Sequence, residues 1–225
     1  MNNSKKIFIP SKGSQDWEPL LANKNHWKPG HSAQELANCW QKADDFPESV
    51  RKVFKDSEID LFQNVELLLA FPEYKVPLPS EEGHPSQNDI FILAKGNCQL
   101  ISITVEGKVK EGFGDTVAIW LNKDNSEGKE KRLKFLLNKL QLNEERVKPI
   151  CYQLLHRTAS AIIEAERFGA KNALMLVHSF SKDNEGLEHY SQFSKLFNWF
   201  GKENSLVFAK NIRGIDLYLC WVEEG

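Results

Sequence analysis

DIFILAKGNCQLISITVEGKV, residues 89–109, is the stretch that decides the fold. Its first part, residues 89–94, is a short apolar run, and its second part, residues 99–109, alternates between apolar and polar side chains. Both patterns are typical of β-strands. The turn-forming pair Gly96-Asn97 stands between them, so the stretch predicts a β-hairpin.

The second strand of this hairpin has two very different faces. Successive side chains of a strand point to opposite sides, so its apolar face carries Ile101, Ile103 and Val105. The other face carries Ser102, Thr104, Glu106 and Lys108. We expect the helix-rich remainder of the chain to cover this polar face, where buried charges need a reason to be present.

Helical patterns stand on both sides of the hairpin. Before it, helices are predicted at residues 32–42, after Pro47, and at 59–70. After it, helices are predicted at residues 116–121, 129–140, 152–168 and 187–200, and strands at 173–177, 205–209 and 216–222. Prolines and a glycine break the chain between residues 72 and 85. This order predicts an α/β protein with a central mixed sheet flanked by helices.

We expect one domain overall. Residues 1–58, with an irregular arm at 10–30, form an N-terminal extension that packs on an α/β core of residues 59–225. The net charge of −2 gives no general attraction for nucleic acid or anionic lipid, so any such binding needs a local patch.

The location that we expect is the cytoplasm, without membrane insertion. No apolar run approaches the roughly 20 residues of a spanning helix, and residues 1–12 lack the pattern of a signal peptide. The four cysteines are far apart and form no C-x-x-C pair. They are expected to be buried or half-buried free thiols in a reducing compartment.

Three charged residues of the hairpin could carry chemistry. Glu106 and Lys108 project from the same face, and the hairpin can bring Asp89 beside them. Two carboxylates are suitable ligands for Mg²⁺ or Mn²⁺, and the ammonium group could orient a water molecule or stabilise a phosphate. Ordinary acid–base pairing on a solvated strand is the alternative.

The string Pro85-Ser86-Gln87-Asn88-Asp89, followed by a hairpin that ends in Val105-Glu106-Gly107-Lys108, resembles the PD-(D/E)xK phosphodiesterase superfamily with its restriction-endonuclease-like fold. The resemblance covers residues 59–180, and the whole chain is also similar to a bacterial family without an assigned function. It implies that Asp89 and Glu106 bind the metal with Lys108 beside them. It also implies a further acid on the preceding helix, for which Glu66 is the candidate and Glu73 a weaker one.

The predicted helix 152–168 adds a polar stripe that consists of Gln153, Arg157, Ser160 and Glu164. Gln153 is expected to position the attacking water and Arg157 to contact a phosphate, although a solvated helix face explains the same residues. The only basic cluster contains Lys131 and Arg132, which could contact a phosphate backbone or simply face solvent.

Two functions follow from these patterns. The first is a Mg²⁺- or Mn²⁺-dependent nuclease that cleaves DNA or RNA. The second is a non-catalytic binding or assembly module on the same fold, since six tryptophans and a long arm suit an interface, including that of a homodimer. No P-loop, G-x-G-x-x-G or G-x-S-x-G motif points elsewhere.

Overall fold

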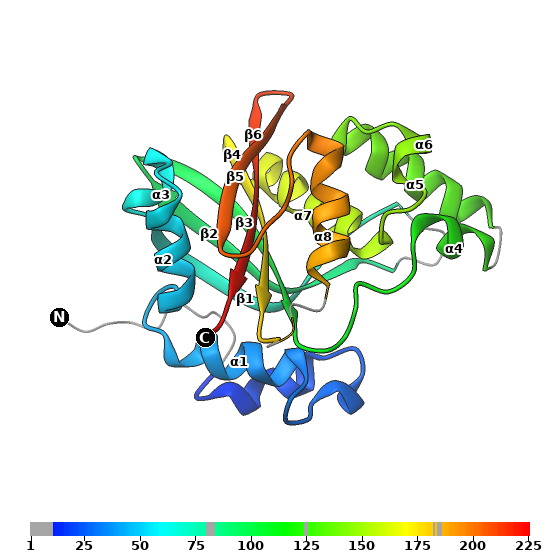
Figure 1. Ribbon diagram of the computed structural model, residues 1–225. Helices are drawn as coiled ribbons and strands as arrows, with labels where there is room; N and C mark the ends of the chain where they lie inside the picture. Colours follow the sequence, from blue (N-terminus) through cyan, green and yellow to red (C-terminus); the bar gives the residue numbers. More distant parts are fainter. Residues whose placement is uncertain (1–10, 80–83, 124–125, 182, 184–185) are drawn as a thin grey trace.

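A computed structural model describes residues 11–79, 84–123, 126–181, 183 and 186–225 (Figure 1). Its middle layer is a six-stranded mixed sheet in the order β1-β2-β3-β4-β6-β5. The strands are β1 (Glu66–Val76), β2 (Ser86–Gly96), β3 (Gln99–Lys108), β4 (Asn172–Ser179), β5 (Ser205–Ile212) and β6 (Ile215–Glu223). Strands β3, β4 and β6 run parallel, and the other neighbours pair antiparallel. The predicted α/β class with a mixed sheet is confirmed.

Helices cover both faces of the sheet (Figure 1). They are α1 (Ser32–Lys42), α2 (Glu48–Asp56), α3 (Asp60–Gln63), α4 (Val117–Asn122), α5 (Glu127–Leu140), α6 (Glu144–Val147), α7 (Tyr152–Phe168) and α8 (Leu187–Ser194), with 3-10 turns at Ser14–Leu20, Lys24–His26 and Lys195–Phe197. Helices α1 to α3 pack on one face in one apolar core, and α5, α7 and α8 pack on the other face in a second core. No helix of the described ranges has the length and apolarity needed to cross a bilayer.

The N-terminal arm packs on the first core. Trp17 is only 2% exposed, and its indole nitrogen donates to the side-chain oxygen of Gln41 on α1, 3.0 Å away. Trp27 is half-buried against the same core. Trp17 therefore serves the fold and is not available as an exposed anchor for a partner. Residues 1–10, which include most of the segment considered for a signal peptide, lie outside the described residues.

The hairpin of β2 and β3 is confirmed, with its turn one residue later than expected. Asn97 and Cys98 form the two-residue loop, and both are left-handed, with φ of 46° and 61°. Two left-handed residues suit the twist of a tight hairpin. Cys98 is exposed at this loop, so the expectation of buried or half-buried thiols is wrong for this residue. Gly96 belongs to β2 and lies against the backbone of Leu61.

The predicted helix over residues 59–70 is wrong beyond its first turn. Only Asp60–Gln63 is helical, and Glu66–Val76 forms the edge strand β1. A continuous apolar run such as residues 67–71 satisfies helical and strand periods equally, so pairing with β2 decides its structure. Pro72 does not break the chain, because an edge strand tolerates a residue that has no N–H to donate. Residues 80–83 of the expected break lie outside the described residues.

Helix α7 and strand β3 are joined by a series of polar contacts that we call the polar ladder. Ser102 donates to the carbonyl oxygen of Ala161 over 2.8 Å, and Thr104 donates to that of Arg157 over 3.0 Å. Two strand residues span about 6.8 Å and four helical residues about 6.0 Å, so each step along β3 meets one turn of α7. The polar face of β3 is thus covered by a helix, as predicted.

A substitution at Gly96 tests the close approach of the hairpin to α3. A Cβ there would stand 2.0 Å from the carbonyl oxygen of Leu61, so backbone must move. We expect Gly96→Ala to lower the free energy of unfolding by about 1–3 kcal/mol, the usual cost of overpacking. Gly112→Ala, whose Cβ would meet nothing within 4 Å, is the matched control and should be close to neutral. Equal urea midpoints for the two variants would contradict this packing.

Candidate active-site pocket

A cavity of about 690 Å³ lies where the polar ladder ends. Its floor consists of strand residues, including Asp89, Glu106 and Lys108. One wall comes from α7 and the segment before α4, and the opposite wall from the N-terminal arm and the start of α1. The backbone N–H of Ser32 on α1 donates to Glu111 over 2.9 Å, which ties the two walls together. Three distant parts of the sequence therefore enclose one pocket.

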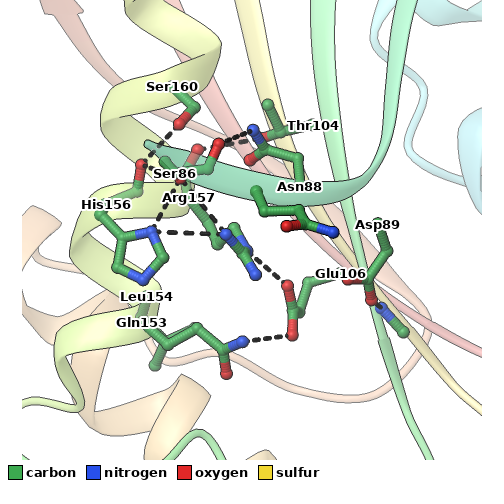
Figure 2. A network of polar contacts seen from close by, with 12 residues as sticks. Ser86, Asn88, Asp89, Thr104, Glu106, Gln153, Leu154, His156, Arg157 and Ser160 are labelled. Atoms are coloured by element: carbon green, nitrogen blue, oxygen red, sulfur yellow. Dashed lines mark hydrogen bonds and ion pairs between the residues drawn. The ribbon is translucent and has the colours of Figure 1, made fainter. Parts of the chain in front are cut away.

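Glu106 is the centre of the pocket's polar network. Figure 2 shows its carboxylate facing Gln153 and Arg157 of α7, the next residues along the polar ladder. The side-chain nitrogen of Gln153 lies 2.6 Å from Oε1, and Nε of Arg157 lies 2.6 Å from Oε2. Lys108 Nζ also donates to Oε1 over 2.7 Å. Lys108, Gln153 and Arg157, all candidate site residues from the sequence, are thus brought together around Glu106.

The charge state of Glu106 follows from these contacts. The residue is only 3% exposed, and burial acts to raise its pKa. The charges and hydrogen bonds of Arg157 and Lys108 outweigh burial and leave the pKa below its ordinary value. Glu106 is therefore an anion that is held between two cations.

Asp89 lies on the neighbouring strand and has the opposite character. Its Oδ2 accepts a hydrogen bond from the backbone N–H of Gly107 over 2.8 Å. Burial, and next the negative charges of Glu106 and Glu73, raise its pKa well above the ordinary value. Gly107 makes room for this arrangement, because a Cβ would press on Leu36 at 3.3 Å and on Asp89 at 3.4 Å.

Glu73 is the third carboxyl group of the pocket. It lies on β1 between the pairs Pro72–Ile90 and Tyr74–Asn88, and its φ of 51° is left-handed. Burial raises its pKa to about 7, against the opposing effect of a 2.7 Å hydrogen bond from Gln87. The sequence predicts the end of a helix and a break over residues 66–76, and this favours Glu66 over Glu73 as the further acid. A strand there would have placed Glu73 beside Asp89.

Glu66 does not reach the pocket. It is exposed at the other end of β1, where it pairs with Lys95. Lys95 and Asp89 are six residues apart on β2, about 20 Å along a strand. One metal ion cannot bridge Glu66 and Asp89 across such a distance.

The two basic residues proposed for phosphate contact have different surroundings. Lys131 forms an exposed ion pair with Glu127 one turn earlier on α5, at 2.8 Å. Arg132 lies closer to the pocket: its guanidinium packs 5.9 Å from the ring centre of Tyr152, a pocket residue, and donates to the carbonyl oxygen of His84. Arg132 thus adjoins a side chain of the pocket.

His156 also lines the pocket and is neutral. Burial, together with the charge of Arg157, lowers its pKa well below the ordinary value. Its Nδ1 lies 2.8 Å from the hydroxyl of Ser86 (Figure 2). The Arg157 guanidinium, which can only donate, lies 3.5 Å from the same ring nitrogen. Nδ1 is thus an acceptor, and Nε2 carries the proton.

A second cluster, Cys39, His178 and Glu224, has ligand-type atoms within 4.8 Å of one another. Trp40 donates its indole N–H to His178 Nδ1 over 3.0 Å. This bond places the ring proton on Nε2, which faces Glu224 at 3.0 Å. A protonated nitrogen cannot ligate a metal, and burial raises the pKa of the Cys39 thiol to about 12. The cluster is a set of hydrogen bonds that secures the C-terminal segment.

Comparison with known proteins adds a family without a function. The family model described as a domain of unknown function, DUF6946, matches residues 10–225. No curated protein and no solved structure matches the chain.

Stability measurements can test the ion pairs of Glu106. We expect Glu106→Gln to cost about 3–5 kcal/mol, because it leaves the buried cations Lys108 and Arg157 without their anion. Adding Arg157→Met should recover part of this loss, since one unpaired charge is removed. Chemical denaturation of the two variants and of Glu66→Gln, an exposed acid, gives the comparison. If the double variant is less stable than Glu106→Gln, the ion-pair account is contradicted.

Proposed function

Because the chain belongs to the DUF6946 family, whose description names no function, we propose one from the pocket: a phosphodiesterase that uses Mg²⁺ or Mn²⁺ to cleave DNA or RNA. The observation that carries the proposal is that Glu73, Asp89 and Glu106 line one pocket together with Lys108. This is the set of groups expected from the resemblance to PD-(D/E)xK enzymes, with Glu73 in the place expected for Glu66.

The carboxyl groups suit a divalent cation. Burial raises the pKa values of Asp89 and Glu73, and the nearby cations Arg157 and Lys108, which are bound by Glu106, do not overcome this effect. A cation would compete with protons for these carboxyl groups. Asp89, Glu73 and Glu106 would supply the hard oxygen ligands that Mg²⁺ and Mn²⁺ prefer. When bound, the ion would activate a water molecule and offset phosphate charge.

The other residues have roles that follow from their contacts. Lys108 is 3% exposed and lies 4.7 Å from the ring centre of Phe113, so its charge acts in a site with little water. In this place it can stabilise charge on a phosphate oxygen. Gln153 bonds both Glu106 and Lys108, and so it can orient an attacking water. Arg157 acts as a positioning residue, because its guanidinium holds the Glu106 carboxylate.

One observation favours the alternative of a non-catalytic module on the same fold. Glu106 accepts from Lys108, Gln153 and Arg157 at once, as a purely structural carboxylate would. In that case Glu106 keeps its ion pairs when Mg²⁺ or Mn²⁺ is added, and neither cation binds in the pocket. The two functions therefore differ in metal binding before any substrate is tested.

Calorimetric titration with Mn²⁺ and Mg²⁺ tests the proposal. We expect binding by the wild type, and at least a tenfold loss in Asp89→Asn because one hard ligand is removed. Glu66→Gln is the matched control. Glu66 lies on the same strand as Glu73, but at the end that is distant from the pocket. Asp89→Asn should also abolish metal-dependent cleavage of labelled DNA and RNA. A wild type that binds neither ion supports the module instead.

The pH dependence of metal binding provides an independent test. Since Glu73 has a pKa of about 7 and that of Asp89 is raised, the ion must displace protons at neutral pH. Apparent affinity should therefore rise from pH 6 to pH 8, by up to about tenfold per pH unit for each proton displaced. Glu73→Gln should flatten this profile. An affinity that is constant over this range in the wild type would mean that the pocket holds no exchangeable proton.

A further inference from the structure

Beside the carboxyl groups, the pocket contains a column of flat side chains. Trp120 of α4 stacks on Tyr152 of α7, with ring centres 3.8 Å apart and planes 6° from parallel. His156 lies next to Tyr152, with ring centres 4.9 Å apart and planes tilted by 45°. All three line the pocket, and Trp120 and Tyr152 are half-buried. Both rings also pack against the apolar core on this side of the sheet, and the part of each ring that lines the cavity can offer a flat surface to a ligand.

The column stands next to the acidic groups. Tyr152 immediately precedes Gln153, whose amide bonds Glu106, and His156 immediately precedes Arg157, which bonds the same carboxylate. One turn of α7 therefore presents rings to one part of the pocket and polar groups to another. A nucleotide has the same two parts, because a flat base and a charged phosphate are joined through one sugar.

Cations flank the rings. Lys129 Nζ lies 5.5 Å from the centre of the Trp120 ring, and the Arg132 guanidinium lies 5.9 Å from that of Tyr152. Aromatic faces with nearby cations are the features by which proteins bind single strands, because stacking accepts any base and the cations attract the backbone. Since the net charge of the chain is −2, attraction of a nucleic acid backbone requires such a local arrangement of cations.

We propose that Trp120 and Tyr152 form a stacking platform for an unpaired nucleobase, so that the pocket takes single-stranded nucleic acid rather than a duplex. The proposal rests on the proposed function and narrows its substrate. Bases inside a duplex are stacked on one another and cannot reach a side chain at the wall of a concave pocket. The arm and the segment before α4 enclose the cavity from two sides, which also suits one strand.

Binding is measured by fluorescence anisotropy in EDTA, so that no cleavage takes place. The probes are labelled twelve-residue oligothymidylate and oligouridylate, a twelve-base-pair duplex, and a twelve-unit abasic strand that has phosphates without bases. We expect the single strands to bind more tightly than the duplex or the abasic strand. The DNA and RNA arms show which sugar is preferred, and preference for either agrees with the proposal.

Variants separate stacking from packing. Trp120→Leu keeps an apolar side chain but removes the aromatic face, and it should weaken single-strand binding by about 5- to 150-fold, as loss of one stacked base does. Trp120→Phe should retain most of the binding. Ile119→Ala, at the exposed neighbour of Trp120, is the matched control. Thermal melting confirms that each variant is folded.

The proposal of a stacking platform is contradicted if the single strands do not bind, or if the duplex binds as tightly as the single strands. It is also contradicted if Trp120→Leu binds the single strands as tightly as the wild type does. These results are independent of those for the metal. Asp89-dependent Mn²⁺ binding without any effect of Trp120 would remove the platform and leave the phosphodiesterase. Trp120-dependent strand binding without metal binding would leave a single-strand-binding module and remove the phosphodiesterase.

Discussion

The polar ladder between β3 and α7 is the constraint on which the rest of the structure depends. The buried hydroxyl groups of Ser102 and Thr104 find acceptors in backbone carbonyl groups of α7, and this fixes the helix along the strand to within one turn. A shift of one turn would move Gln153 and Arg157 away from Glu106 and leave this buried carboxylate without two of its partners. The same contacts that cover the polar face of the sheet therefore assemble the pocket.

A consequence of this register is an uneven distribution of charge. The buried cations Lys108 and Arg157 of the pocket are both bound to Glu106, which stays ionised. Asp89 and Glu73 are only a short distance away, but burial and the neighbouring negative charge favour their protonated forms. Similar carboxyl groups thus differ in pKa because Glu106 is the one that is bonded by side chains of α7. Such divergence is common where proteins bind metals or move protons.

The histidines illustrate how neighbours decide the role of a residue type. His178 is held between the Trp40 indole and the Glu224 carboxylate, and its tautomer is fixed in a form that serves only the fold. His156 is equally neutral, but it belongs to the aromatic column of the pocket, where its ring is within reach of a ligand. In both cases burial lowers the pKa, and the hydrogen-bond donors around Nδ1 determine where the proton stands.

By itself, the sequence determined the hairpin, the two faces of β3 and helix α7 from Tyr152 to Phe168, because strict alternation and clear helical spacing are local signals. It also indicated Asp89, Glu106, Lys108 and Gln153 as one group of candidate catalytic residues. Only the tertiary structure decided that residues 66–76 form a strand, that Glu73 and not Glu66 joins this group, and that Trp120 stacks on Tyr152 beside it. An apolar run fits either period until a neighbouring strand supplies hydrogen-bond partners. Contacts between α4 and α7 join residues 32 positions apart, and no pattern along the chain encodes such a distance.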